Sequence, residues 1–325
     1  MSTLKKYQHV ICFDGTGNTA ENIREITNVY KLHELLEKSE TINPLYLQGV
    51  GTRIGEQFSG KIWGDGIKER LIEAYRWLTD QRNNKKRLLD FHNIYVFGFS
   101  RGAYIARMFC WLIDKCAIPS EISQCDVLFE HFLNLAHGHC DLSEFEEIID
   151  KWQQEHEFTR QDIDMLGVWD TVKTADFGDS SLPWDHALAD NVKYAFHAMA
   201  LDELRELFPV LRFNEDKRVF ERWFAGNHCD IGGGYPEDGL SNIALQWMLD
   251  RAMELDLSFV NKALTCDISQ SCHDETKHCT WQLLGKQKRV VLSNDCLHET
   301  VKDKQKNYNY CPQPTLPAEI TFVPA

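Results

Sequence analysis

The sequence predicts an α/β fold in which a mostly parallel central sheet carries helices on both faces. Two patterns support this prediction. Short apolar runs alternate along the chain with longer segments whose apolar residues recur at helical spacing. Several of the apolar runs end in glycine-rich or acidic turns, and the carboxyl ends of parallel strands are where such folds place their ligands.

Composition and charge are those of an ordinary soluble globular protein. The chain is 43% hydrophobic and 26% charged, and its 325 residues suffice for one large α/β domain or two small ones. We expect a single domain over residues 1–325, with a helical insertion over 116–160 and an irregular C-terminal extension over 256–325. The net charge of −14 argues against nucleic acid as a partner, because its phosphates would repel the chain.

The sequence also bears on localisation and metal binding. No apolar run is long enough to span a membrane, and the first residues lack the apolar core of a signal peptide, so no stable membrane insertion is expected. The 11 cysteines are scattered without a C-x-x-C pair, which favours reduced thiols and a cytoplasmic location. The Cys and His residues over 266–279 lack zinc-site spacing, so no metal and no cofactor is expected.

An apolar run over 8–13 predicts a first strand that ends at Asp14. The glycine-rich loop after it, over 15–19, lacks both the dinucleotide fingerprint and the lysine of a P-loop, so it is not a nucleotide site. One hypothesis is that a backbone N–H near Gly15 or Thr16 binds an oxyanion. The alternative, of equal weight, is a tight turn capped by Asp14.

Helical spacing predicts helices over 26–36 and 67–78, and a short strand is expected over 43–47. The glycine-rich stretch over 49–66 predicts a long loop. Such a loop is either a lid at the rim of a pocket or a surface loop without a function.

The central pattern of the chain lies at residues 93–109, where an apolar run leads into Gly98-Phe99-Ser100-Arg101-Gly102 and then into a helix-like run. A serine on a strained turn between strand and helix leaves room only for very small residues two positions away on either side. The helix that follows points its N-terminal N–H groups at the serine. Because ordinary glycine-rich turns match the same pattern, an acid and a histidine must also follow later strands.

Both follow. The apolar run over 163–169 ends at Asp170, and the run over 219–224 leads into a glycine-rich loop that contains His228. Each residue alone is explained by a cap, a turn or a structural histidine. The order Ser100, Asp170, His228 is that of α/β-hydrolases and differs from the orders of chymotrypsin and subtilisin.

Three more elements are expected in this half. A helix over 191–207 carries Asp202 and Glu203, to which the nearby arginines assign an ion-paired structural role. A long helix is expected over 243–255 with Ser241 as its N-cap, and a strand over 288–293.

Several motifs occur together along nearly the whole chain. They are Asp14-Gly15-Thr16-Gly17-Asn18, Gly49-Val50-Gly51-Thr52, Gly98-Phe99-Ser100-Arg101-Gly102-Ala103-Tyr104, Gly167-Val168-Trp169-Asp170-Thr171-Val172, Ala200-Leu201-Asp202-Glu203, His228-Cys229-Asp230-Ile231-Gly232-Gly233-Gly234-Tyr235 and His298-Glu299-Thr300-Val301. The set resembles the α/β-hydrolase family that includes the type VI secretion phospholipase effectors. The resemblance implies an α/β-hydrolase-like fold with Ser100 as nucleophile, Asp170 as orienting acid and His228 as base.

The expected function is therefore hydrolysis of carboxylic esters, of the lipase, phospholipase or carboxylesterase type, with an ester or lipid small molecule as substrate. The Arg101 N–H and a second donor at Gly15 or Thr16 are expected to bind the oxyanion. The alternative is a non-catalytic interaction module with a hydrolase fold, which the presence of all three triad residue types disfavours. A secretion-machine or immunity partner is compatible with the resemblance.

Overall fold

The computed structural model describes residues 5–15, 26–49, 60–84, 91–173, 182–277 and 285–324. An 8-stranded sheet runs through its centre in the order β10-β9-β8-β7-β6-β3-β1-β2, and all neighbouring strands are parallel. The strands are β1 (Lys6–Phe13), β2 (Ile42–Leu47), β3 (Phe91–Phe99), β6 (Met165–Trp169), β7 (Ala195–Ala200), β8 (Val219–Phe224), β9 (Cys296–His298) and β10 (Thr321–Val323).

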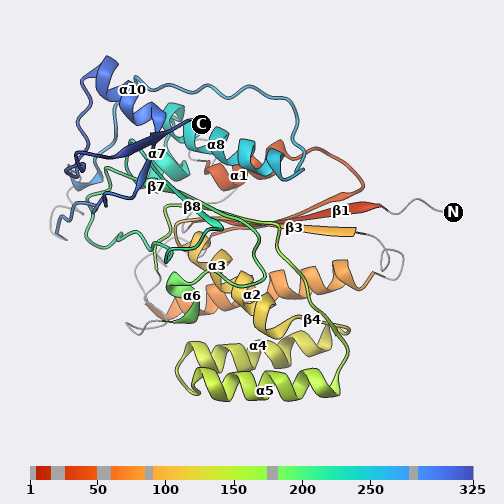
Figure 1. Cartoon of the computed structure of the whole chain (residues 1–325). Coiled ribbons are helices and arrows are strands. Elements are labelled where there is room, and N and C mark those ends of the chain that lie inside the picture. The colour runs from red at the N-terminus through yellow and green to blue at the C-terminus, as the bar shows by residue number, and fades with distance from the viewer. Residues whose placement is uncertain are drawn as a thin grey trace.

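Helices cover both faces of this sheet (Figure 1). One face carries α2 (Gly60–Arg82) and α3 (Arg101–Cys116), and the other carries α1 (Asn28–Leu35) and α8 (Gly239–Glu254). Strand β3 contributes side chains to both faces. Ile94 and Val96 belong to the core under α2 and α3, and Tyr95 and Phe97 belong to the core under α1 and α8. Alternate side chains of one strand thus bury both faces. The predicted α/β-hydrolase-like fold is confirmed.

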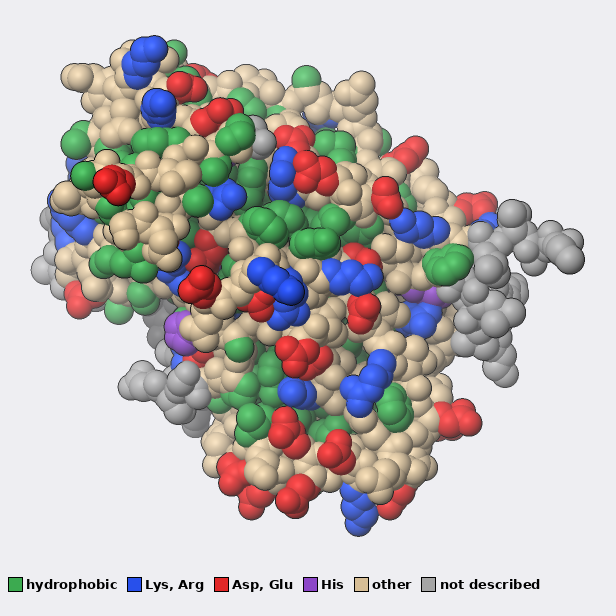
Figure 2. All heavy atoms as spheres, in the orientation of Figure 1, with side chains coloured by type: hydrophobic (Ala, Val, Ile, Leu, Met, Phe, Trp, Pro, Cys, Tyr) green, Lys and Arg blue, Asp and Glu red, His purple; other side chains and the backbone are tan. Residues whose placement is uncertain are grey.

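A helical hairpin lies beyond α2 and α3, on the side away from the sheet (Figure 1). It consists of α4 (Ser123–Ala136) and α5 (Leu142–Glu155), flanked by the short antiparallel strands β4 (Ile118–Pro119) and β5 (Phe158–Thr159). Acidic side chains outnumber basic ones along both helices, and they gather at the lower end of the molecule (Figure 2). This lobe therefore repels anionic surfaces.

The predicted helix over 191–207 is wrong, because this segment contains the central strand β7. All six residues of β7 are buried. A strand buried on both faces has no alternation of polar and apolar residues, so its sequence pattern cannot be told from that of a buried helix. The correction matters for the site, since it places Asp202 and Glu203 just past the carboxyl end of a central strand.

Two further predictions are corrected. The helix expected from residue 67 begins at Gly60, inside the predicted loop over 49–66, while the proposed lid falls largely on residues outside the described ranges. Residues 288–293, which are all described, form no strand. The extension over 256–325 instead contributes a 3₁₀ turn at Glu275–Lys277, β9, α10 (Glu299–Tyr308) and β10. The short helix α6 (Pro183–His186) lies earlier in the chain, between β6 and β7. No helix in the described ranges is long and apolar enough to cross a membrane.

Candidate active site

Ser100 lies on the sharp turn between β3 and α3, at the carboxyl edge of the sheet. Its backbone angles are φ 58° and ψ −124°, which a residue with a side chain rarely adopts. The Ser100 N–H donates to the Trp169 carbonyl at 3.0 Å, and the Ser100 carbonyl accepts from the Val172 N–H at 3.3 Å. The strained turn is therefore held by the end of the neighbouring strand β6.

Two glycines make this turn possible. A Cβ at Gly98 would lie 2.5 Å from the Gly102 carbonyl oxygen, and a Cβ at Gly102 would lie 2.3 Å from the Phe13 carbonyl oxygen. Both distances are far below van der Waals contact, so a side chain at either position would force the backbone to move, in agreement with the reasoning from the sequence. The second contact also places the first turn of α3 directly against the end of β1.

Asp170 follows β6 and is completely buried, with an unusual φ of 35°. Its Oδ1 accepts the Ala200 N–H at 3.0 Å. Its Oδ2 lies 2.7 Å from His228 Nδ1 and accepts from Arg289 Nη2 at 2.9 Å. Burial alone would raise the pKa of Asp170, but the Arg289 charge and the hydrogen bonds from His228 and Ala200 bring it down to about 2. The carboxylate is therefore ionised.

His228 is the first residue of α7 (His228–Gly232), directly after the β8 turn. Its imidazole packs between the rings of Phe99 and Phe208, with centroids 4.6 Å and 5.1 Å away. Burial lowers the pKa of His228 below the ordinary 6.5, although the bond to Asp170 acts in the opposite direction. The ring is therefore neutral at pH 7, and because Asp170 holds the proton on Nδ1, Nε2 is left as a proton acceptor.

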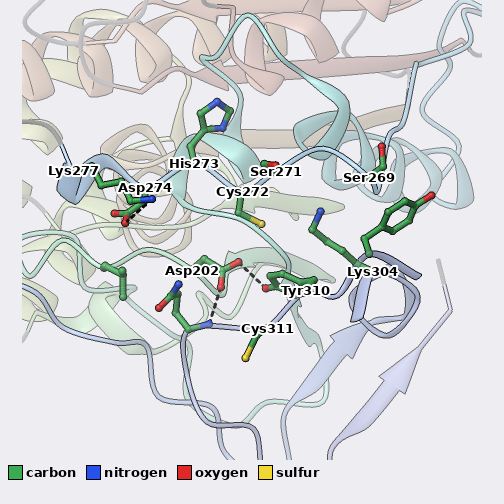
Figure 3. A pocket seen from close by; sticks show the side chains of 13 residues that line it. Asp202, Ser269, Ser271, Cys272, His273, Asp274, Lys277, Lys304, Tyr310 and Cys311 are labelled. Atoms are coloured by element: carbon green, nitrogen blue, oxygen red, sulfur yellow. Dashed lines mark hydrogen bonds and ion pairs between the residues drawn. The ribbon is translucent and has the colours of Figure 1, made fainter. Parts of the chain in front are cut away.

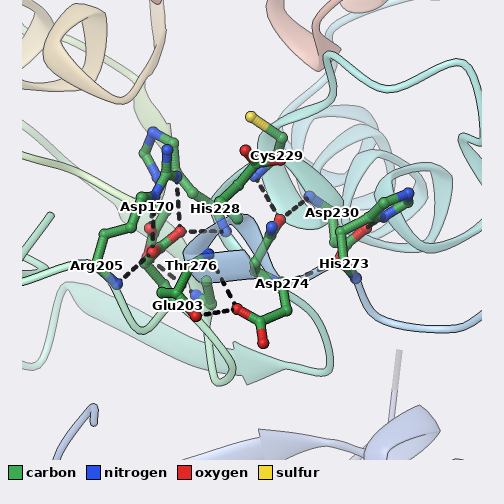
Figure 4. A network of polar contacts seen from close by, with 12 residues as sticks. Asp170, Glu203, Arg205, His228, Cys229, Asp230, His273, Asp274 and Thr276 are labelled. Carbon is green, nitrogen blue, oxygen red and sulfur yellow. Dashed lines mark hydrogen bonds and ion pairs between the residues drawn. The ribbon is translucent and has the colours of Figure 1, made fainter. Parts of the chain in front are cut away.

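A second ion pair supports the His228 backbone (Figure 4). Glu203 accepts the His228 N–H at 3.3 Å and Arg205 Nη2 at 2.7 Å. The Arg205 guanidinium lies 3.8 Å over the Phe208 ring, which itself packs on His228. The predicted ion-paired role is confirmed for Glu203.

The loop after β1 is organised by the buried carboxylate of Asp14. Asp14 accepts hydrogen bonds from the Gly15 N–H at 2.6 Å, from Thr27 Oγ1 at 2.8 Å and from the Tyr46 hydroxyl. Burial raises the pKa of Asp14 to about 6, against these three bonds. Because the Gly15 N–H is donated to Asp14, the geometry favours the tight turn capped by Asp14 over an oxyanion donor at Gly15. Thr16 lies outside the described residues.

A polar pocket of about 290 Å³ opens beside Asp202 and is lined mainly by the C-terminal extension (Figure 3). Among the described residues Asp202 has no arginine partner, but it accepts the Tyr310 hydroxyl at 2.6 Å and the Gly226 N–H at 2.7 Å. It thereby joins the extension to the loop that precedes His228. None of the three predicted catalytic residues lines this pocket.

The structure brings Asp170 and His228 into direct contact and places the Ser100 turn against the Asp170 turn through backbone hydrogen bonds. Reasoning from the sequence did not identify Arg289 or Phe208 as site residues. Arg289 lies in a segment that was expected to be a strand, and no sequence pattern marks Phe208. In the described part of the chain, no three His, Cys, Asp or Glu side chains gather as a metal site.

Comparison with known proteins gives several solved structures with partial likeness, among them the following two. An uncharacterized protein from Pseudomonas aeruginosa is 19% identical with a TM-score of 0.46, over 79% of this chain and 47% of that one. The Tle1 effector bound to the VgrG spike of the type 6 secretion system is 22% identical with a TM-score of 0.40, over 71% of this chain and 51% of that one. The chain thus matches only about half of each of these longer proteins.

Among curated proteins, the uncharacterized Saccharomyces cerevisiae protein YEL023C is 27% identical over 132 residues, which are 34% of this chain and 18% of the yeast protein. A family model described as the catalytic domain of Tle1-like phospholipase effectors of the type VI secretion system matches residues 7–251. That match includes Ser100, Asp170 and His228. Since it extends over more than half of the chain, this protein belongs to the Tle1-like family of type VI secretion phospholipase effectors.

Proposed function

We propose that this protein is a serine hydrolase that cleaves the carboxylic esters of phospholipids. The observation that carries the proposal is the buried 2.7 Å contact between Asp170 and His228, beside the strained Ser100 turn. The packing of the Phe99 ring, which precedes Ser100, on the His228 ring supports the same arrangement. Membership of a phospholipase effector family supports phospholipids as the substrate class.

The mechanism follows from the protonation states of these groups. His228 Nε2 takes the proton from Ser100 Oγ as this oxygen attacks the ester carbonyl. Asp170 keeps the proton on Nδ1 and stabilises the imidazolium that forms. The imidazolium then protonates the departing alcohol, and water attacks the acyl-enzyme by the same proton route, which releases the fatty acid and restores Ser100.

The negative charge on the carbonyl oxygen needs preorganised donors. We propose the Arg101 N–H as the first donor, because it stands at the N-terminus of α3, directly after Ser100. We propose that the second donor follows β1 in the chain, because the Gly102 contact lies at the end of β1. Thr16, which lies outside the described residues, is the candidate that the sequence leaves, because the Gly15 N–H is already donated to Asp14. Loss of one such donor costs about 3 kcal/mol of transition-state stabilisation.

Two alternatives remain for the same fold. A small-molecule esterase would use the same residues. The acidic α4–α5 lobe favours this alternative, because the lobe is repelled by the anionic lipid surfaces that a phospholipase must approach. A non-catalytic interaction module is disfavoured by the surroundings of Asp170. This fully buried carboxylate is bound by three groups, the Ala200 N–H, Arg289 and the neutral His228. Burial of such a charge is expensive in free energy unless it is paired.

A partner is proposed on the same family basis. The Tle1 effector of the solved complex is bound to a VgrG spike, and we propose that this chain is likewise carried by a secretion machine. Co-purification of the chain with a spike protein, compared with a carrier unrelated to secretion, tests this part. Before such delivery the chain is expected in the cytoplasm.

The test of the hydrolase proposal is covalent labelling by a fluorophosphonate, which reports an activated serine without knowledge of the substrate. Wild-type protein is expected to react and Ser100→Ala to remain unlabelled. Hydrolysis of phosphatidylcholine vesicles is then compared with that of short soluble nitrophenyl esters, to separate a phospholipase from an esterase. A folded wild type that neither reacts with the probe nor hydrolyses any ester would move the assignment to the interaction module.

A further inference from the structure

The guanidinium of Arg289 lies against the acid of the proposed triad, although 119 positions separate the two residues. Arg289 Nη2 donates to Asp170 Oδ2 at 2.9 Å, and the same oxygen lies 2.7 Å from His228 Nδ1. Arg289 is only 7% exposed. Its Nε and Nη1 atoms have no hydrogen-bond partner among the described residues, so the ion pair with Asp170 is the main compensation for the burial of this cation.

A cation on this oxygen has two effects on the contact between Asp170 and His228, here called the His–Asp pair. It keeps the carboxylate ionised, because burial alone favours the neutral acid. It also opposes a second positive charge on the imidazole, because like charges a few ångströms apart repel each other. Both effects favour the state in which Asp170 is ionised and His228 is neutral.

We propose that Arg289 is a positioning residue of this active site, which holds Asp170 ionised and aligned and so keeps His228 able to accept a proton near neutral pH. Its catalytic meaning rests on the proposed serine hydrolase function. The protonation of the His–Asp pair, however, is measurable without any turnover. Arg289 does not touch substrate or the reacting atoms in this account, and acts only through Asp170.

Other charged groups also face the His–Asp pair, but in these groups each cation is paired with a carboxylate. Glu203 is bound by Arg205 on the side of the histidine backbone. Behind Asp170, the buried His197 contacts Glu221 at 3.0 Å, and Arg212 donates to the same carboxylate at 2.9 Å. Since these cations already have acidic partners, Arg289 is the cation that acts on the shared oxygen itself.

The experiment is a pH titration of protein labelled with ¹⁵N-histidine, followed by NMR. The His228 signals are identified from their loss in His228→Gln. In Arg289→Gln the protonation midpoint of the His–Asp pair is expected to rise by about one pH unit, because the pair takes up a proton more easily once the neighbouring cation is removed. The midpoint is expected to rise whether the proton is assigned to Asp170 or to His228.

Two further variants make the result specific. Arg289→Lys keeps the positive charge but loses the planar guanidinium, so a smaller rise is expected, and it serves as the test variant if Arg289→Gln does not fold. Arg218→Gln is the matched control, since Arg218 pairs with Asp216 at 2.7 Å, away from the His–Asp pair, and no shift is expected. Midpoints that stay at the wild-type value in both Arg289 variants overturn the inference.

The inference and the proposed function fail in different ways. A raised midpoint in a protein whose folded wild type neither reacts with fluorophosphonate nor hydrolyses any ester supports the role of Arg289 and removes the hydrolase proposal. A reactive wild type with unmoved midpoints supports the hydrolase and refutes the positioning role. If both hold, the acid limb of the pH–rate profile of Arg289→Gln shifts upward with the titration midpoint, which a purely structural arginine would not cause.

Discussion

Replacement of Gly102 by alanine tests the geometry of the serine turn more directly than removal of a catalytic group. The added Cβ would lie 2.3 Å from the Phe13 carbonyl oxygen and 2.5 Å from the Asp14 carbonyl oxygen. Both neighbours are backbone atoms at the end of β1, so no side chain can rotate away. Relief to an ordinary contact requires α3 and β1 to separate by about 1 Å.

That separation acts on both stability and catalysis. Overpacking of a rigid contact lowers the free energy of unfolding by about 1–3 kcal/mol. The same movement displaces Ser100 and the Arg101 N–H from the loop that is proposed to complete the oxyanion hole. A misplacement of about 1 Å in an active site reduces the rate by about 10²-fold. We therefore expect Gly102→Ala to fold but to react about 100-fold more slowly.

The assay combines urea unfolding with the rate of fluorophosphonate labelling and of nitrophenyl ester hydrolysis. Gly138→Ala is the matched control, because nothing lies within 4 Å of the added Cβ at that position, although its φ of 70° makes alanine unfavourable. It is expected to lose about 1 kcal/mol of stability with unchanged rates. Wild-type rates in Gly102→Ala would refute the proposed coupling between β1 and the serine turn.

Three other predictions use the same assays. The value of kcat/KM should fall as pH decreases through the pKa of His228, because only the neutral imidazole accepts a proton. Burial lowers the pKa of His228 below 6.5, so the midpoint of the pH profile should also lie below 6.5. A midpoint above 6.5 would contradict the buried environment of His228. Asp170→Asn should reduce kcat by about 10⁴-fold through the wrong histidine tautomer, and a loss below tenfold would argue against a triad. Tyr310→Phe removes the hydrogen bond to Asp202 and should lower the free energy of unfolding by about 1–2 kcal/mol in urea, whereas unchanged stability would show that the C-terminal extension is not anchored there.

Much of the fold was predictable because its signals are local. The apolar runs before Asp14, Ser100 and Asp170 predicted β1, β3 and β6 where the structure has them. The prediction failed at β7, where burial on both faces removed the alternation that distinguishes a strand from a helix. The predicted strand over 288–293 failed for a related reason, since its residues have strand-like composition but pair with no strand in the described part of the chain.

The sequence by itself determined the serine turn, the chain order of Ser100, Asp170 and His228, and the glycines that the turn requires, because these depend on spacing within one segment or along the chain. Only the tertiary structure decided what surrounds them. The bond from Arg289 to Asp170 joins positions 119 apart, and the capture of the Gly15 N–H by Asp14 depends on how a single loop is packed. Contacts of this kind leave no periodicity in the sequence, because they arise when several strands end at one edge of the sheet and bring distant residues together.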